Sequence, residues 1–459
     1  MAEQHQYDVV VLGAGSGGYA AALRAAQLGL RVALIEADKV GGTCLHRGCV
    51  PTKAMLHCAE VADEVREAAK VGVEATFEGI DLGGVNRFKQ GVVDRLHKGL
   101  QGLVSGRGVT LVNGHGRVVS PTAVQVGGQI VEGANLVLAT GSYARSLPGL
   151  AIEGRIMTSD QALRLDWIPR RPIVLGGGVI GLEFASIWSS FGAQPTIVEA
   201  LANLAPNEDA AISKALERAF RRRGIGYKLG VKVSHVTQDG DTVTVTLEDG
   251  QSLQGDALLV AVGRGPNTAG VGFEDIGVAM DRGFVIADER LATNIPQVWA
   301  VGDIVPGLQL AHRGFAQGIA VAERIAGLSP APLVESGIPR VTYCEPEIAS
   351  VGLTEAAAKA EHGPDAVETV EYNLAGNGKS QVLATQGFVK LVRLAGGPVV
   401  GAHMVGKRVG ELVGEAQLIV NWEAYPEDVA ELVHAHPTQD EAIGEAFLAL
   451  AGKPLHAHA

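Results

Sequence analysis

The hydrophobic pattern at the beginning of the chain predicts a strand, a helix and a second strand in succession. Residues 7–12 (YDVVVL) form a continuous apolar run, as expected for a strand buried in a parallel sheet. The glycine-rich segment 13–18 (GAGSGG) then opens an alanine-rich helical stretch that extends to about Leu28. Residues 31–36 (RVALIE) predict the second strand, which ends in a glutamate. This order is typical of a βαβ unit.

The same pattern recurs in the middle of the chain. Residues 172–181 (PIVLGGGVIG) predict a strand and a glycine-rich turn, and a helical stretch follows. Residues 194–199 (QPTIVE) predict the second strand, which again ends in a glutamate. The spacing from the first glycine of the turn to this glutamate is 23 residues in both copies. The sequence therefore contains an internal duplication of a βαβ unit.

Other patterns predict antiparallel strands and a change of domain. The stretches 108–131 and 233–250 alternate with a period of two, which predicts antiparallel meanders. Short apolar strands at 135–141 and 257–264 close each half. After the proline-rich segment 329–340 the pattern changes to strands followed by helices, which predicts a separate α+β domain.

Length and composition indicate a globular protein of several domains. At 459 residues the chain is too long for one hydrophobic core, and the usual domain size predicts roughly three domains. A net charge of -12 argues against nucleic acid or an anionic membrane as the main partner, because both favour basic patches. An acidic surface remains compatible with docking of a basic protein module.

The N-terminal segment and the cysteine content favour a cytoplasmic protein. MAEQHQYDVVVLG lacks a basic region before an apolar core, so no signal peptide is expected. No window approaches the roughly 18 apolar residues that a membrane-spanning helix needs. The four cysteines, Cys44, Cys49, Cys58 and Cys344, are too few for a disulfide-dense secreted scaffold.

The two glycine-rich turns are placed to bind two dinucleotides. Each has the pattern GxGxxG between a strand and a helix, so that the backbone can approach a pyrophosphate at the positive helix N-terminus. The glycines are Gly13, Gly15 and Gly18 in the first copy, and Gly176, Gly178 and Gly181 in the second. Glu36 and Glu199, at the ends of the next strands, are placed to accept hydrogen bonds from a ribose diol.

Two adenine dinucleotides suggest a flavin beside a nicotinamide cofactor. Glu199 favours NAD over NADP, because a carboxylate repels a 2′-phosphate and residues 200–209 offer no arginine to bind one. The alternative that Glu199 is only a solvated strand end stays open.

Cys44 and Cys49 stand close together in GGTCLHRGCVPTK, residues 41–53. A structural disulfide is disfavoured in a reducing compartment, and a zinc site would need two more ligands, with His46 the only imidazole between the pair. A redox pair needs one thiol exposed to substrate and another near an electron acceptor, with positive charge nearby. The position after the Glu36 strand favours this third interpretation.

Seven motifs occur in order along the chain: GAGSGGYAAALRAAQLG, GGTCLHRGCVPTK, ATGS, GGGVIGLE, VGRGPNT, WAVGD and HAHPTQDE. Together they resemble the pyridine nucleotide-disulfide oxidoreductases, flavoenzymes that include glutathione reductase, mercuric reductase and dihydrolipoamide dehydrogenase. The resemblance implies an α/β fold with two Rossmann-like domains, for FAD and NAD, and a C-terminal α+β dimerisation domain. The expected boundaries are 1–145 and 269–336 for the FAD-binding domain, 146–268 for the NAD-binding domain and 337–459 for the dimerisation domain.

The resemblance also implies roles for residues at matching positions. Cys49 is expected beside the flavin, and Cys44 is expected to attack the substrate. Lys53 is expected at the flavin ring, paired with Glu183, although both could be plain surface residues. Glu36 is expected to bind the adenosine ribose of FAD. Other cofactor contacts are expected from Gly116, Thr140, Gly141, Ser142, Gly263, Asp303 and Ala311, with Asp303 at the ribityl chain.

Near the C-terminus, His436 matches the acid/base of the family and Glu441 the residue that orients its ring. His434 is the less favoured candidate. In the family this histidine reaches the cysteines of the other subunit, so the resemblance implies a homodimer with shared active sites. It also suggests a cis bond before Pro437.

Within the family, the first helix resembles that of a dihydrolipoamide dehydrogenase. Leu23 stands where glutathione reductases carry an arginine, and the chain ends KPLHAHA without the cysteine pair of mercuric reductases. The resemblance thus implies oxidation of protein-bound dihydrolipoamide through a Cys44–Cys49 disulfide and FAD, with NAD reduced to NADH.

The implied partner is the lipoyl-bearing acyltransferase of a 2-oxoacid dehydrogenase complex, or a glycine-cleavage carrier protein. Two alternatives stay open. One is another NAD(P)H-dependent FAD disulfide reductase, and the other is chiefly an assembly subunit that docks a carrier protein. The motif departs from the family at His46, where asparagine is common, and is followed by Arg47.

Overall fold

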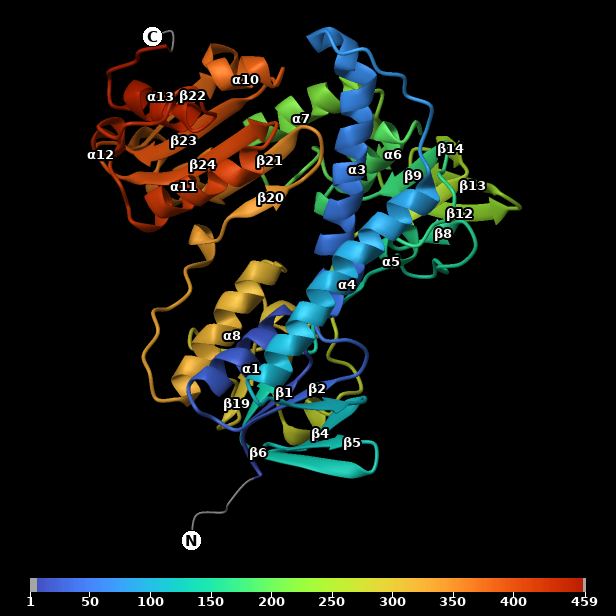
Figure 1. Ribbon diagram of the computed structural model, residues 1–459, viewed down its shortest axis with the longest axis vertical. Helices are drawn as coiled ribbons and strands as arrows, with labels where there is room; N and C mark the ends of the chain where they lie inside the picture. The colour runs from blue at the N-terminus through green and yellow to red at the C-terminus, as the bar shows by residue number, and fades with distance from the viewer. Residues whose placement is uncertain (1–5, 457–459) are drawn as a thin grey trace.

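A computed structural model describes residues 6–456. Figure 1 shows a lower unit that contains the N-terminal strand, an upper unit around β9, and a C-terminal unit beside it. Two long helices, α3 (Cys49–Glu67) and α4 (Leu82–Gly106), extend between the lower and upper units.

The lower unit is built on a seven-stranded sheet with the order β3-β2-β1-β6-β5-β4, to which β19 adds beside β6. Its strands are β1 (Tyr7–Leu12), β2 (Val32–Glu36), β3 (Thr110–Asn113), β4 (Gly116–Ser120), β5 (Ala123–Val126), β6 (Gln129–Leu138) and β19 (Val298–Ala300). The apolar run of β1 is buried as predicted, with Val10 and Val11 at 0% exposure. Helices α1 (Ser16–Gln27) and α8 (Ala311–Ile325) pack against each other on this sheet.

The sequence pattern assigned residues 108–131 to one antiparallel meander, and this was wrong for the first strand. β3 pairs in parallel with β2, and only β4, β5 and β6 form the meander. β6 belongs to both arrangements, because its second half pairs in parallel with β1.

The upper unit repeats the architecture around the second copy of the βαβ pattern. Five parallel strands have the order β11-β10-β9-β15-β8. They are β8 (Ile156–Met157), β9 (Pro172–Leu175), β10 (Thr196–Val198), β11 (Gly226–Lys228) and β15 (Ala257–Val260). The helices are α5 (Ser159–Ala162), α6 (Val179–Ser190) and α7 (Ala210–Arg222). A predicted meander is present as β12 (Val233–Asp239), β13 (Thr242–Leu247) and β14 (Ser252–Gly255).

Small strands link and extend the two units. β7 (Ser142–Ala144) and β16 (Arg264–Pro266) pair antiparallel where the chain enters and leaves the upper unit. A short hairpin follows in β17 (Met280–Asp281) and β18 (Phe284–Val285). The pairing of β7 with β16 brings residues of the lower and upper units next to each other.

The C-terminal unit is an antiparallel five-stranded sheet covered by helices, with the order β20-β21-β24-β23-β22. Its strands are β20 (Arg340–Thr342), β21 (Glu347–Gly352), β22 (Val367–Asn373), β23 (Phe388–Leu394) and β24 (Val399–Gly406). Its helices are α9 (Glu355–His362), α10 (Gly378–Val382), α11 (Val409–Asn421), α12 (Pro426–Ala430) and α13 (Glu441–Leu450). The edge strand β22 is mostly exposed and carries two glutamates, so no apolar run marks it in the sequence.

A parallel sheet, a mixed sheet with a parallel core, their helices and a separate α+β unit confirm the predicted fold class. None of the helices within residues 6–456 has both the length and the apolar character required to cross a bilayer.

Candidate active site

A cavity of about 1440 Å³ lies between the two glycine-rich turns. Residues of the lower and upper units line it, and β20 of the C-terminal unit closes part of its wall. The volume exceeds the roughly 300–1000 Å³ of a pocket for one small ligand. The predicted site residues that line it are Gly15, Cys44, Cys49, Lys53, Gly141, Ser142, Gly176, Gly178, Glu183, Glu199, Gly263, Asp303 and Ala311.

The remaining predicted site residues lie outside the cavity wall. They are Gly13, Gly18, Glu36, Gly116, Thr140, Gly181, His436 and Glu441. The glycines among them serve close packing. A Cβ on Gly13 would collide with the carbonyl of Ala139, and one on Gly18 would collide with the carbonyl of Gly13. These two glycines therefore let strand and helix approach at the first turn, and Gly176 and Gly181 repeat the arrangement at the second.

Each turn also fixes a glutamate in the same way. The carboxylate accepts one hydrogen bond from the amide after the first glycine and one from the amide two residues beyond the glutamate itself. The donors are Ala14 and Asp38 for Glu36, and Gly177 and Leu201 for Glu199, at 2.7–2.8 Å. The duplication predicted from the sequence thus extends to single hydrogen bonds.

The space at the turns fits dinucleotides. Gly15 and Gly178 line the cavity, and a Cβ on either would meet no protein atom within 4 Å. A side chain there would project into the space where a pyrophosphate can approach the N-terminus of α1 or α6. Thr140 Oγ1 is buried and finds no hydrogen-bond partner among the described residues. The residues present therefore fit one dinucleotide at each turn.

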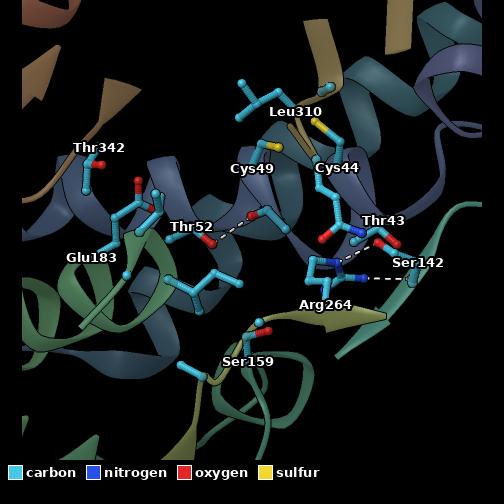
Figure 2. Close-up of a pocket in the computed structure, with 18 of the residues that line it drawn as sticks. Thr43, Cys44, Cys49, Thr52, Ser142, Ser159, Glu183, Arg264, Leu310 and Thr342 are labelled. Carbon is cyan, nitrogen blue, oxygen red and sulfur yellow. Dashed lines mark hydrogen bonds between the residues drawn. The ribbon is translucent and has the colours of Figure 1, made fainter. Parts of the chain in front are cut away.

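The two cysteines lie on consecutive helices whose sulfurs face each other (Figure 2). Cys44 is on α2 (Gly42–Arg47) and Cys49 begins α3, and both are free thiols. The Cys44 thiol donates a hydrogen bond to Cys49, which lowers the pKa of Cys49 to about 7 against the effect of burial, and Lys53 assists. The same hydrogen bond raises the pKa of Cys44. Cys49 is therefore the sulfur that carries the thiolate of this pair.

Lys53 forms an ion pair with Glu183 inside the cavity. Its Nζ lies 2.7 and 2.8 Å from the two carboxylate oxygens, and the Glu183 side chain is only 4% exposed. Burial is the largest single influence and acts to lower the pKa of Lys53, but the charge and hydrogen bond of Glu183, together with the charges of Cys49 and Tyr343, outweigh it and raise the pKa. Lys53 thus remains a cation beside Cys49.

Tyr343 is a cavity residue that the sequence did not indicate. Its backbone N–H donates to Glu183 at 3.1 Å, and Lys53 Nζ lies 4.7 Å from the centre of its ring. No glycine or charge pattern marks this position, because the contact depends on how the C-terminal unit packs onto α6.

Arg264 is a second missed residue, although it lies in a motif that was recognised. Ser142 Oγ donates to Asp303 at 2.5 Å. Arg264 donates to Ser142 Oγ and to its carbonyl, both at 2.7 Å (Figure 2). The pairing of β7 with β16 creates this network. It places a guanidinium on the wall between the two units.

His436 and Glu441 form a hydrogen-bonded pair away from the cavity. His436 Nδ1 lies 2.8 Å from Glu441 Oε1, and the other carboxylate oxygen accepts from the Thr438 N–H at 2.8 Å. The His436 side chain is 78% exposed, and the bond to Pro437 is cis. Within its own chain, this histidine therefore points to solvent and not into the cavity. His434 instead pairs with Glu415 at 2.9 Å and is largely buried.

The two residues that depart from the family motif tie α2 to the segment after β2. His46 Nε2 lies 2.9 Å from the Val40 carbonyl, and its ring packs edge-to-face on His97 of α4. Arg47 lies 3.3 Å from the carboxylate of Asp38. Both contacts hold the helix that carries Cys44.

Comparison with known proteins connects this geometry to a family. Residues 7–318 match the family Pyridine nucleotide-disulphide oxidoreductase, and residues 338–447 match its dimerisation domain. A dihydrolipoyl dehydrogenase of Bacillus subtilis is 40% identical, with 98% of this chain and 99% of the relative covered. A leghemoglobin reductase of Vigna unguiculata is 38% identical, with 98% and 88% covered.

Two solved structures superpose on this chain over nearly its whole length. LpdA of Mycobacterium tuberculosis superposes with a TM-score of 0.90 at 28% identity, covering 96% of this chain and 99% of that one. The flavoprotein disulfide reductase RclA of Escherichia coli superposes with a TM-score of 0.86 at 27% identity, covering 96% and 99%. The chain belongs to the pyridine nucleotide-disulphide oxidoreductase family.

Proposed function

We propose that the chain is a dihydrolipoyl dehydrogenase, an oxidoreductase with FAD and NAD as cofactors. The observation that carries the proposal is the facing thiol pair Cys44 and Cys49, in a cavity that both dinucleotide-type turns share. Relatives over 98% of the chain bear this name, including those of Bacillus subtilis and Cupriavidus necator.

Each glycine-rich turn, with the residues around it, is assigned one cofactor. The turn with Gly15, the carboxylate of Glu36 and the Asp303 segment would hold FAD. The turn with Gly178 and the carboxylate of Glu199 would hold NAD. This assignment gives residues 1–145 and 269–336 to FAD, 146–268 to NAD and 337–459 to dimerisation. When bound, FAD supplies the transfer of an electron pair from the protein dithiol to NAD.

The thiol chemistry begins with the Cys44–Cys49 disulfide. One substrate thiolate attacks Cys44, the bond between the two cysteines breaks, and Cys49 leaves as a thiolate. The second substrate thiol then displaces Cys44. The substrate leaves as a cyclic disulfide, and the protein remains as a dithiol. Lys53 and the Cys44 thiol stabilise the negative charge on Cys49.

His436 is the proposed base that accepts the substrate proton, with Glu441 holding its ring. Because the pair is exposed and outside the cavity of its own chain, it is assigned to the cysteines of a second copy in a homodimer. The match of residues 338–447 to a dimerisation domain supports this arrangement.

The proposed partner is a lipoyl-bearing acyltransferase of a 2-oxoacid dehydrogenase complex, or a glycine-cleavage carrier protein. The net charge of -12 favours a basic docking module. The proposed compartment is the cytoplasm.

A substrate comparison tests the function. The purified enzyme is assayed with dihydrolipoamide and NAD, and separately with NADPH and glutathione disulfide. Formation of NADH in the first mixture is expected, and NAD should be preferred to NADP because residues 200–209 offer no arginine to bind a 2′-phosphate. Faster turnover of glutathione disulfide with NADPH would contradict the proposal.

Two matched glycine substitutions should separate the cofactor sites. Gly15 and Gly178 have ordinary extended backbone angles and open space at the Cβ, so valine fits the protein but fills the cavity. We expect Gly178→Val to weaken NAD binding about tenfold or more at unchanged flavin content, and Gly15→Val to deplete flavin. Calorimetry with NAD and the flavin absorbance measure these effects. Flavin loss in Gly178→Val with normal NAD binding would reverse the assignment.

The thiolate of Cys49 should titrate near neutral pH. In the reduced enzyme its ultraviolet absorbance is expected to appear with a midpoint of about 7 as the pH rises. Lys53→Met should move the midpoint upward, because the cation is lost and the Glu183 charge remains. Cys49→Ser supplies the blank, and Lys70→Met, at an exposed position, is the matched control. An unchanged midpoint in Lys53→Met would refute the role of this lysine.

A further inference from the structure

A buried ion pair joins the upper unit to the C-terminal unit. Lys390 Nζ, on β23, lies 2.8 Å from Asp209 Oδ1, at the start of α7. The two side chains are only 5% and 2% exposed. Buried charges are costly unless they are paired and hydrogen-bonded, so the Asp209 carboxylate depends on Lys390 for its counter-charge.

Asp209 makes further contacts that fix its position. Its Oδ1 also accepts from the Ala211 N–H at 3.0 Å, which caps α7, and its Oδ2 accepts from the Glu355 N–H at 3.1 Å. Lys390 donates at the same time to the Glu355 carboxylate at 2.6 Å. The C-terminal unit therefore holds the beginning of α7 through two bonds to Asp209, one from Lys390 and one from the Glu355 N–H.

The segment just before Asp209 reaches the cavity. Pro206, Asn207 and Glu208 line it, close to Gly178 and Glu199 of the second glycine-rich turn. At the N-terminal end of this segment, the Ala205 N–H donates to the carbonyl of Gly177, in the second glycine-rich turn, at 2.9 Å. A displacement of Asp209 would thus move the wall of the second dinucleotide site.

A second contact from the C-terminal unit acts on the same segment. Ser350 Oγ donates to Glu208 at 2.5 Å, and Arg340 Nε lies 3.3 Å from the other oxygen of that carboxylate. Ser350 is fully buried. Two neighbouring carboxylates, Glu208 and Asp209, are therefore both held by the sheet of the C-terminal unit.

We propose that Asp209 and Lys390 are positioning residues for the pyridine nucleotide, with the C-terminal unit holding segment 205–209 against the second glycine-rich turn. This inference rests on the proposed function, which places NAD at that turn. It assigns to the C-terminal unit a share in NAD binding in addition to dimerisation. The pair touches no reacting atom and acts through the segment that lines the site.

The test compares single and double neutral variants in the purified, flavin-loaded enzyme. Asp209→Asn keeps the size of the side chain, and Lys390→Met keeps most of its length. The dissociation constant of NAD is measured by calorimetry. The midpoint of thermal unfolding and the rate at which dihydrolipoamide reduces the flavin-loaded enzyme without NAD are measured as well. We expect each variant to raise the dissociation constant about fivefold, with the reduction rate unchanged.

The double variant Asp209→Asn/Lys390→Met separates positioning from a purely structural role. It buries no unpaired charge, so its thermal midpoint should recover toward wild type. The weaker NAD binding should persist, because the tie to β23 is still missing. Wild-type NAD affinity in the double variant, or a parallel fall in the rate of reduction by dihydrolipoamide, would overturn the proposal.

A matched control and a milder variant complete the design. Lys407→Met removes another tie of the C-terminal unit, to Glu64 on α3, and should leave NAD affinity at wild-type level. Ser350→Ala removes only the hydroxyl that holds Glu208, and should weaken NAD binding in a folded protein. Equal losses in Lys407→Met and Lys390→Met would contradict the inference. Because calorimetry needs no turnover, these results are distinguishable from inactivity toward dihydrolipoamide, which would overturn the proposed function alone.

Discussion

Replacing Cys44 by serine is expected to abolish turnover of dihydrolipoamide while flavin and NAD stay bound. A serine hydroxyl cannot form a disulfide, so the exchange between substrate and protein has no acceptor. Because Cys44 lines the cavity without supporting the glycine-rich turns, cofactor binding should persist. We expect a loss of more than about 10⁴-fold, measured as NADH formation.

Cys58→Ser is the matched control for this variant. Cys58 is a half-buried thiol on α3, the helix that Cys49 begins, and it does not line the cavity. It should keep wild-type turnover. If Cys44→Ser retained more than about a hundredth of the activity, the thiol relay would be excluded as the route of electrons.

Replacing His436 by glutamine is expected to have the second largest effect. Removal of a general base typically costs about 10²- to 10⁴-fold in rate. The His436 side chain is exposed, so its loss should leave the stability of the fold nearly unchanged. The measurement is the rate of NADH formation with dihydrolipoamide and NAD. His434→Gln is the comparison, because that ring is paired with Glu415 instead.

Mixing the two inactive variants tests whether the site is shared between subunits. In a hybrid dimer of Cys44→Ser and His436→Gln chains, one of the two shared sites has both Cys44 and His436 intact, and the other site has neither. Random exchange should therefore restore about one quarter of wild-type activity, since half of the dimers are hybrids with one of two sites intact. If His436 served the cysteines of its own chain, the mixture would stay as inactive as its components.

Local features of the site could be predicted from the sequence. The turn at Gly13 and the glutamate at Glu36 lie within one βαβ unit, so their spacing alone places them together. The same holds for Cys44 and Cys49, which only the last residues of α2 and Gly48 separate. Patterns of this kind depend on helix and strand periods, which a single sequence shows directly.

Contacts between distant segments could not be predicted in this way. Asp209 and Lys390 are 181 positions apart, and Tyr343 reaches Lys53 only because the C-terminal unit packs onto α6. His46 was left without a role, since its partner is the carbonyl of Val40 and a backbone acceptor leaves no mark in the sequence. Such pairings are fixed by tertiary packing, which composition and periodicity do not encode.

The twin hydrogen bonds at Glu36 and Glu199 have a consequence for how the two halves diverged. Since both carboxylates are anchored by equivalent amides, the duplicated unit presents the same acceptor to the ribose diol of either FAD or NAD. Discrimination between FAD and NAD must then come from residues around this repeated unit. In the second half, the segment that ends at Asp209 lines the cavity beside the repeated unit, so changes of cofactor preference can be engineered there.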